Sequence, residues 1–224
     1  MKAKLNWWSD NWEHILNGCR STLGKGETNK QPSSQFKQKL ILSEHSPIRK
    51  LCFDITIKNL KSWASVHLVR HKHGIEHMVQ SQRDDIDKNI TKQKELDESY
   101  WNEIKALYAK LGIEVSEDRD ASPQSMLIQH NIFVNAQCIL NICKKRFCTS
   151  AHPYTRKLAE EISISIADVC VELYNACVPN CVYRGGICHE FKQCGYNQTE
   201  LFKNHLDYYV NLWKDVKKPY YMED

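Results

Sequence analysis

One short segment concentrates much of the cationic chemistry of the chain. Residues 66–85 read VHLVRHKHGIEHMVQSQRDD, with four histidines around a single glycine. Arg70 and Arg83 offer fork-shaped donors that suit phosphate, and Lys72 adds a compact positive charge. Ser81 adds a hydroxyl close to Arg83. These residue types predict a cradle for a polyanionic ligand, and a solvated charged loop is the alternative.

The sequence before this segment predicts the elements that position it. Residues 51–57 alternate apolar and polar side chains, which indicates a strand, and residues 59–61 are expected to form a turn. Ser62 can then cap a helix that runs to about Val69, because its hydroxyl can accept a hydrogen bond from an amide of the first turn. The cationic segment therefore begins at the end of a helix and enters a loop at Gly74.

A second strand and helix are predicted later in the chain. Residues 128–134 alternate as a strand, and Asn135 is expected to cap a helix over residues 136–147. Further helices are predicted over residues 1–19, 97–111, 153–177 and, with Thr199 as the cap, toward the C-terminus. Helices mixed with a few strands, without regular strand–helix alternation, predict the α+β class and a single domain over residues 1–224.

Composition and charge narrow the classes of function. The 224 residues are 42% hydrophobic and 26% charged, which is ordinary for a globular protein and excludes wholesale disorder. No run approaches the roughly 20 apolar residues of a membrane span. Acidic residues interrupt the N-terminus before a signal peptide can form, so we expect a cytoplasmic protein without a membrane partner. The net charge of +4 suits a small phosphorylated ligand but lacks the concentrated basic run of a nucleic-acid binder.

Ten cysteines in a chain without a secretion signal indicate reduced thiols, a metal site or plain burial. Four of them fall in a glycine- and cysteine-rich loop over residues 177–195, where the glycines permit tight turns. This set could close a tetrahedral zinc site, and it consists of Cys177, Cys181, Cys188 and Cys194. Buried or free thiols are the default interpretation, because the spacings are not those of a standard zinc knuckle.

Three separated elements resemble the motifs of one enzyme family, the flavin-dependent thymidylate synthases. Residues 70–72 followed by residues 81–83 resemble the family signature RHRxxSxNxxSxR. Arg119, with a proline four residues on, resembles the element RxxLP, and residues 134–146, VNAQCILNICKKR, resemble the helix VNxRxLxNFxxxR. The elements occur in the family's order over residues 43–162, so the chain is similar to a divergent member of this family.

The resemblance implies a fold, a reaction and a set of contacts. The implied fold is a small antiparallel sheet flanked by helices, in a homotetramer whose sites combine several subunits. The implied reaction converts dUMP to dTMP, with methylenetetrahydrofolate as carbon donor, reduced FAD as hydride source and NADPH as reductant. The implied FAD contacts are Arg70, His71, Lys72, Asn135 and Asn141. The implied dUMP contacts are His67, Ser81, Arg83, Arg119 and Arg146, of which Ser81, Arg83 and Arg146 are the catalytic group.

Departures from the family motif leave other functions open. The span from Arg70 to Arg83 is one residue longer than the signature, and Lys72 replaces its second arginine. A relative that acts on dCMP, or that transfers the carbon as a hydroxymethyl group, could keep the same framework. The basic loop and the cysteine cluster also suit a non-catalytic module that binds nucleic acid or is stapled by zinc.

Overall fold

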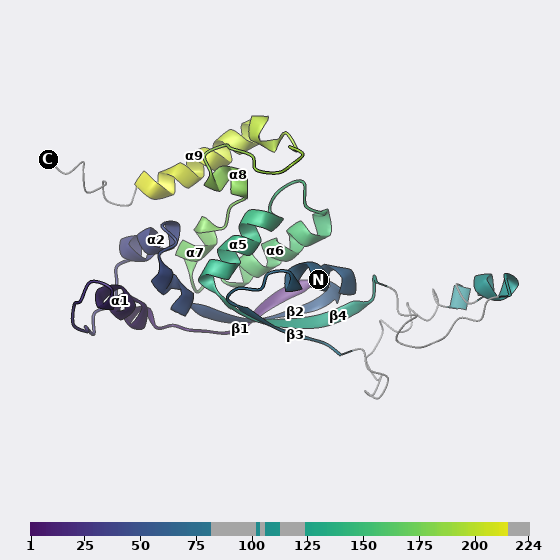
Figure 1. Cartoon of the computed structure of the whole chain (residues 1–224), viewed down its shortest axis with the longest axis horizontal. Helices are drawn as coiled ribbons and strands as arrows, with labels where there is room; N and C mark the ends of the chain where they lie inside the picture. Colours follow the sequence, from purple (N-terminus) through teal and green to yellow (C-terminus); the bar gives the residue numbers. More distant parts are fainter. Residues whose placement is uncertain (82–101, 104–105, 113–123, 215–224) are drawn as a thin grey trace.

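The computed structural model describes residues 1–81, 102–103, 106–112 and 124–214. Its centre is a four-stranded antiparallel sheet in the order β1-β2-β4-β3 (Figure 1). The strands are β1 (Lys2–Trp8), β2 (Cys52–Lys61), β3 (Ile75–Val79) and β4 (Leu127–Asn135). Strands that are neighbours in this sheet are far apart in sequence. The pairing of β4 with both β2 and β3 therefore brings the separated motifs of the chain together.

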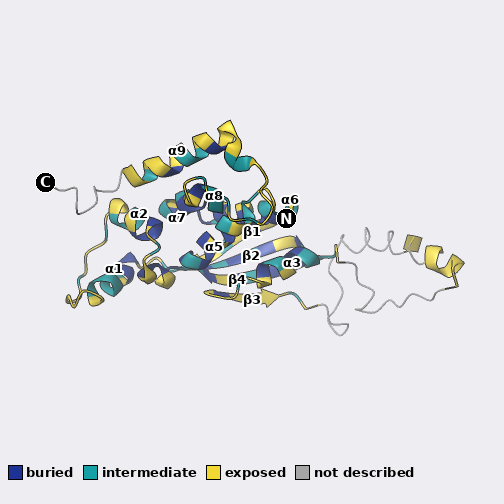
Figure 2. Ribbon diagram, turned by 45° about the horizontal axis from the view of Figure 1, so that its top comes forward, coloured by how far each residue is buried: buried dark blue, intermediate teal, exposed yellow. Residues whose placement is uncertain are grey.

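The two central strands were predicted from their alternation, and both are confirmed. Every second side chain of β2 and β4 is buried, and Phe53 of β2 faces Val134 of β4 in the register (Figure 2). Burial of one face fixes this register, because a slip by one residue would expose the apolar set. The predicted turn at 59–61 is wrong, since β2 continues through a bulge at which Asn59 adopts a φ of 56°.

Helices cover one face of the sheet. In Figure 1, α5, α6 and α7 lie over the sheet, and α8 and α9 lie beyond them. The bounds are α1 (Trp12–Ser21), α2 (Ser34–Leu42), a 3-10 helix (Ser46–Lys50), α3 (Ser62–Val69), α5 (Ala136–Arg146), α6 (Pro153–Ser165), α7 (Val171–Ala176), α8 (Asn180–Tyr183), a 3-10 helix (Tyr196–Gln198) and α9 (Glu200–Lys214). The hydrophobic core fills the space between these helices and the sheet. No helix in the described ranges is long and apolar enough to cross a membrane.

The N-terminal prediction is wrong for its first half. Residues Lys2–Trp8 form a strand whose backbone pairs with β2, with Ala3 opposite Ile57. The partner strand lies far along the chain, so local periodicity does not reveal the pairing. The predicted helix begins only at Trp12, where the Asn11 side chain accepts a hydrogen bond of 2.8 Å from an amide of the first turn.

The helix predicted over 153–177 is two helices with a break at 166–170. The hydroxyls of Ser163 and Ser165 donate to the carbonyls of Glu160 and Ile162, at 2.9 and 2.7 Å. Such bonds compete with the helical ladder where α6 ends. The predicted helix over 97–111 lies partly outside the described residues, and residues 102–103 and 106–110, which are described, are helical.

The predicted caps have mixed outcomes. Asn135 caps α5, since its Oδ1 accepts from the amide of Cys138 at 2.9 Å. Thr199 caps α9 through a 3.1 Å bond from the amide of Phe202. Ser62 is instead the first helical residue of α3, and Lys61 holds the cap position without a side-chain cap bond. The amide of Ser62 donates to the carbonyl of Met126, 2.8 Å away.

Candidate active site

The cationic segment forms a short loop between α3 and β3. Arg70 is the C-terminal cap of α3, and the amide of His71 donates to the carbonyl of Leu68 at 3.0 Å. Gly74 closes the loop with a φ of +75°, and a Cβ there would lie 2.2 Å from the side-chain nitrogen of Asn135. Only glycine fits this left-handed position against that neighbour. The amide of Asn135 in turn donates to the carbonyl of Gly74 at 2.8 Å, so the loop is anchored at both ends.

The last turn of α5 brings a second cationic group against this loop. Arg146 donates from a terminal guanidinium nitrogen to the carbonyl of His67, 2.7 Å away. Burial, followed by the nearby charge of Arg70, lowers the pKa of Arg146 from its ordinary value. A cavity of about 290 Å³ opens here, lined by Arg70, His71, Lys145, Arg146, Cys148, Ser150, Ala151 and Glu190.

Two histidines beside Arg146 have unusual surroundings. Burial, followed by the charge of Arg146 and then of His77, lowers the pKa of His71 to about 4, so this imidazole is neutral at pH 7. Burial and the same arginine also lower the pKa of His67. The His71 Nε2 and His67 Nδ1 atoms are buried without a hydrogen-bond partner among the described residues. A buried ring nitrogen is costly to leave unpaired, so each atom would gain a hydrogen bond wherever a ligand group reached it.

The structure brings together only part of the residue set expected from the sequence. Arg70, His71 and Arg146 line one cavity, and His67 is bonded to Arg146 through its carbonyl. Lys72, Asn141 and Ser81 are exposed and are not among the residues that line it. The side chain of Asn135 serves as the cap of α5 and packs on Gly74. Arg83 and Arg119 lie outside the described residues.

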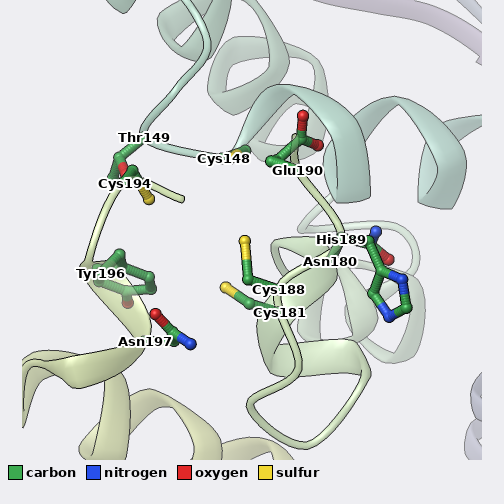
Figure 3. Close-up of a pocket in the computed structure, with 10 residues that line it drawn as sticks. All are labelled: Cys148, Thr149, Asn180, Cys181, Cys188, His189, Glu190, Cys194, Tyr196 and Asn197. Atoms are coloured by element: carbon green, nitrogen blue, oxygen red, sulfur yellow. The ribbon is translucent and has the colours of Figure 1, made fainter. Parts of the chain in front are cut away.

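The four cysteines considered as a zinc set from the sequence do not come together in the structure. Cys177 is buried, and a hydrogen bond with it raises the pKa of Cys143. The other three candidates line a pocket of about 20 Å³ together with Cys148 (Figure 3), and this group is Cys181, Cys188 and Cys194. No three His, Cys, Asp or Glu side chains in the described part of the chain are arranged to hold a metal ion. Cys148 belongs to this thiol pocket and Cys177 does not, because α7 directs Cys177 into the core.

Sequence reasoning missed several residues of the cavity. Lys145 precedes Arg146 in a KKR run, so its position beside a motif arginine was a usable signal. Ser150 follows α5 closely and also lines the cavity. Glu190 comes from the cysteine-rich loop, and nothing local in the sequence connects that loop with the cationic segment. Its carboxylate lies 3.9 Å from the ammonium of Lys145.

The sheet order and the covering helices define an α+β protein, and a cationic cavity lies between α3 and α5. The family described as thymidylate synthase complementing protein matches residues 3–170, and the chain belongs to this family. The recognition made from the three motifs is therefore confirmed.

Two solved structures are similar to this chain. One is a crystal structure of the flavin-dependent thymidylate synthase ThyX from Helicobacter pylori complexed with FAD and dUMP, and the other is ThyX from the same organism with the same two ligands. Each is 17% identical with a TM-score of 0.60, and the match covers 80% of this chain and 100% or 99% of the other. This likeness confirms the α+β fold. No curated protein matches the sequence.

Proposed function

We propose that the protein is a flavin-dependent thymidylate synthase, which methylates dUMP to dTMP with methylenetetrahydrofolate as carbon donor and reduced FAD as hydride source. NADPH is the proposed reductant. The observation that carries the proposal is that Arg70, His71 and Arg146 line one cationic cavity, although they belong to two motifs far apart in sequence. Membership of the thymidylate synthase complementing protein family supports the same reaction.

Arg70 and His71, which line the cavity, suit the diphosphate of FAD, and the other proposed contacts lie outside the cavity lining. The proposed contacts are Arg70, His71, Lys72, Asn135 and Asn141. Arg70 can pair with the diphosphate through two parallel hydrogen bonds, and the unpaired Nε2 of the neutral His71 offers one more bond without adding charge. When bound, FAD supplies the hydride, and the protein supplies placement and electrostatics.

The proposed nucleotide group is His67, Ser81, Arg83, Arg119 and Arg146, with Ser81, Arg83 and Arg146 as the catalytic set. Arginines in this group would neutralise the phosphate and the pyrimidine carbonyls of dUMP. The bond from Arg146 to the carbonyl of His67 fixes its guanidinium at the rim of the cavity, so its remaining donors are already oriented toward a ligand. We further propose a cytoplasmic homotetramer whose sites combine several subunits.

A direct assay of the full-length protein tests the reaction. We expect purified protein supplemented with FAD to be yellow and, with NADPH and methylenetetrahydrofolate, to release tritium from [5-³H]dUMP. Mass spectrometry of the products from dUMP and from dCMP separates methylation from hydroxymethylation and identifies the base. A protein that binds no flavin and releases no tritium under these conditions contradicts the proposal.

A measurement of mass in solution tests the assembly. The homotetramer predicts a particle of four times the 26.2 kDa of one chain. Mass photometry at working concentration with FAD present gives this value directly. A monomer or a dimer at every concentration would overturn the tetramer and leave the reaction to be decided by the assay.

A further inference from the structure

Three side chains from three different elements form a continuous hydrogen-bonded chain behind the cationic loop. Ser65 of α3 lies 3.0 Å from His130 of β4, between Oγ and Nδ1. His130 Nε2 lies 3.0 Å from His77 Nδ1 on β3, and His77 Nε2 lies 3.1 Å from the carbonyl oxygen of His71. Ser65 and His130 are buried, and His77 is half-buried on the edge strand. The chain therefore runs from the core to the main chain of the loop.

The carbonyl partner fixes the direction of one bond in this chain, and the tautomer of His77 sets the direction of the other two. A carbonyl oxygen accepts only, so His77 must carry its proton on Nε2 and donate to His71. In the tautomer with its proton on Nε2, His77 accepts at Nδ1 from the Nε2 proton of His130. The Nδ1 of His130 accepts in turn from the hydroxyl of Ser65. Burial and the neighbouring His77 lower the pKa of His130 to about 4, which agrees with a neutral ring at pH 7.

We propose that Ser65, His130 and His77 are positioning residues, which hold the main chain of His71 and thereby place Arg70 and His71 at the cavity. This inference rests on the function proposed above for that cavity. Without His77, the described bonds on the loop carbonyls and amides are those at its two ends, from Asn135 to Gly74 and from His71 to Leu68. The bond to the His71 carbonyl adds a third anchor, on the residue whose amide is bonded to Leu68.

The placement of His130 supports positioning rather than simple packing. Its neighbours on the same face of β4 are the buried Ile128, Ile132 and Val134, so an apolar side chain there would avoid the cost of burying two ring nitrogens. Both nitrogens are paired with groups on other elements, which makes the fully satisfied chain a rigid connection between α3, β4 and β3.

Histidine-selective ¹⁵N NMR and hydrogen exchange on the full chain test the inference without any ligand. We expect the ring proton to lie on Nε2 in both His77 and His130. In His130→Leu and His77→Phe, the amides of His71 and Asn135, which are bonded at the two ends of the loop, should exchange about tenfold faster, as loss of one buried hydrogen bond implies. His130→Gln should stay close to the wild type, because its terminal amide can occupy the place of Nε2 and donate to His77.

Ligand binding provides the second readout. FAD binding to His130→Leu and His77→Phe should weaken about tenfold relative to the wild type, and His130→Gln should recover most of that loss. His205→Leu is the matched control, since His205 is a partly buried histidine on α9 whose ring is bonded only to the Tyr196 hydroxyl among described residues. His77→Phe keeps an aromatic ring on the edge strand, so it remains informative where His130→Leu fails to fold.

The outcomes separate this inference from the proposed function. Unchanged exchange in a folded His77→Phe, or a proton on Nδ1 of His77, overturns the positioning role whatever the protein binds. A wild type that binds no FAD contradicts the proposed function, and the exchange of the His71 and Asn135 amides still decides the role of the hydrogen-bonded chain. Faster exchange in the control variant would show a general loss of stability and would also count against the inference.

Discussion

Arg146 contributes charge to the cavity and also binds the backbone of a neighbouring helix. One guanidinium nitrogen is committed to the carbonyl of His67, and burial beside Arg70 lowers the pKa of the group. A lysine could supply the charge but not the second planar pair of donors. We therefore expect ligand binding to depend on the planar pair of donors of the Arg146 guanidinium as well as on its charge.

Substitution of Arg146 tests this reading. Arg146→Ala should weaken dUMP binding about 10- to 100-fold, since a hydrogen bond to a charged group contributes roughly 1.5–3 kcal/mol. Arg146→Lys should recover only part of the loss. Isothermal titration calorimetry gives the dissociation constants. Arg20→Ala is the matched control, because Arg20 also donates to a main-chain carbonyl, that of Gly26 at 2.6 Å, but it lies outside the cavity. Equal losses in Arg20→Ala and Arg146→Ala would contradict the assignment.

His130 makes stability depend on pH. Its pKa is about 4 in the fold and 6.5 ordinarily, so below pH 6.5 the unfolded chain binds a proton that the folded chain refuses. The free energy of unfolding should therefore fall between pH 7 and pH 4, by about 3 kcal/mol from this residue alone. Urea denaturation at a series of pH values measures the slope. His130→Gln should show a shallower slope, and an unchanged slope would refute this account.

At the scale of elements, the contact between the cationic loop and the start of α5 holds the two parts of the site together. Gly74 combines a positive φ with direct packing on Asn135, so the loop and the helix cap share one tight contact. The cap orients α5, whose last turn carries Arg146 to the cavity. A substitution at Gly74 should therefore lower the free energy of unfolding and also disturb the arrangement of the cavity.

Alanine substitutions at two glycines separate the cost of a positive φ from the cost of a steric clash with Asn135. Gly74→Ala should lower the free energy of unfolding by about 2–3 kcal/mol, because it adds a steric clash to the cost of a left-handed backbone. Gly24→Ala is the matched control, with a φ of +65° and no atom within 4 Å of the added Cβ, and it should cost about 1 kcal/mol. Urea denaturation measures the free energy of unfolding of both variants. Equal losses would show that the Asn135 side chain moves aside at no cost.

Local sequence patterns predicted the elements whose cause is local. The strands β2 and β4 follow from alternation, and the caps Asn135 and Thr199 follow from their side-chain oxygens. β1 and β3 were missed because strand pairing, a long-range interaction, creates them. In β3, the polar His77 lies on the face that carries His130. A polar residue at this position breaks the alternation of apolar and polar residues that predicts a strand. The motif resemblance identified Arg70, His71 and Arg146, but not how they meet.

At the scale of the whole molecule, the segment after residue 170 adds to a site that the family core begins. The family match ends at residue 170, yet Glu190 lines the same cavity as Arg70 and Arg146. This segment is joined to the core by a 2.5 Å bond from the Gln38 side chain to the carbonyl of Leu212 and by the burial of Phe202. It places one negative charge in a cavity whose other charged groups are cationic.

Removal of that charge should strengthen anion binding. Glu190 pairs with Lys145 at 3.9 Å and both side chains are substantially exposed, so the pair contributes at most about 1 kcal/mol. Glu190→Gln should therefore tighten dUMP binding by about twofold to fivefold, with the gain shrinking as salt is added. Glu200→Gln, which removes an exposed carboxylate paired with Lys203 on α9, should leave the dissociation constant unchanged. Weaker binding in Glu190→Gln would instead mean that the carboxylate contacts the ligand and contributes to its recognition.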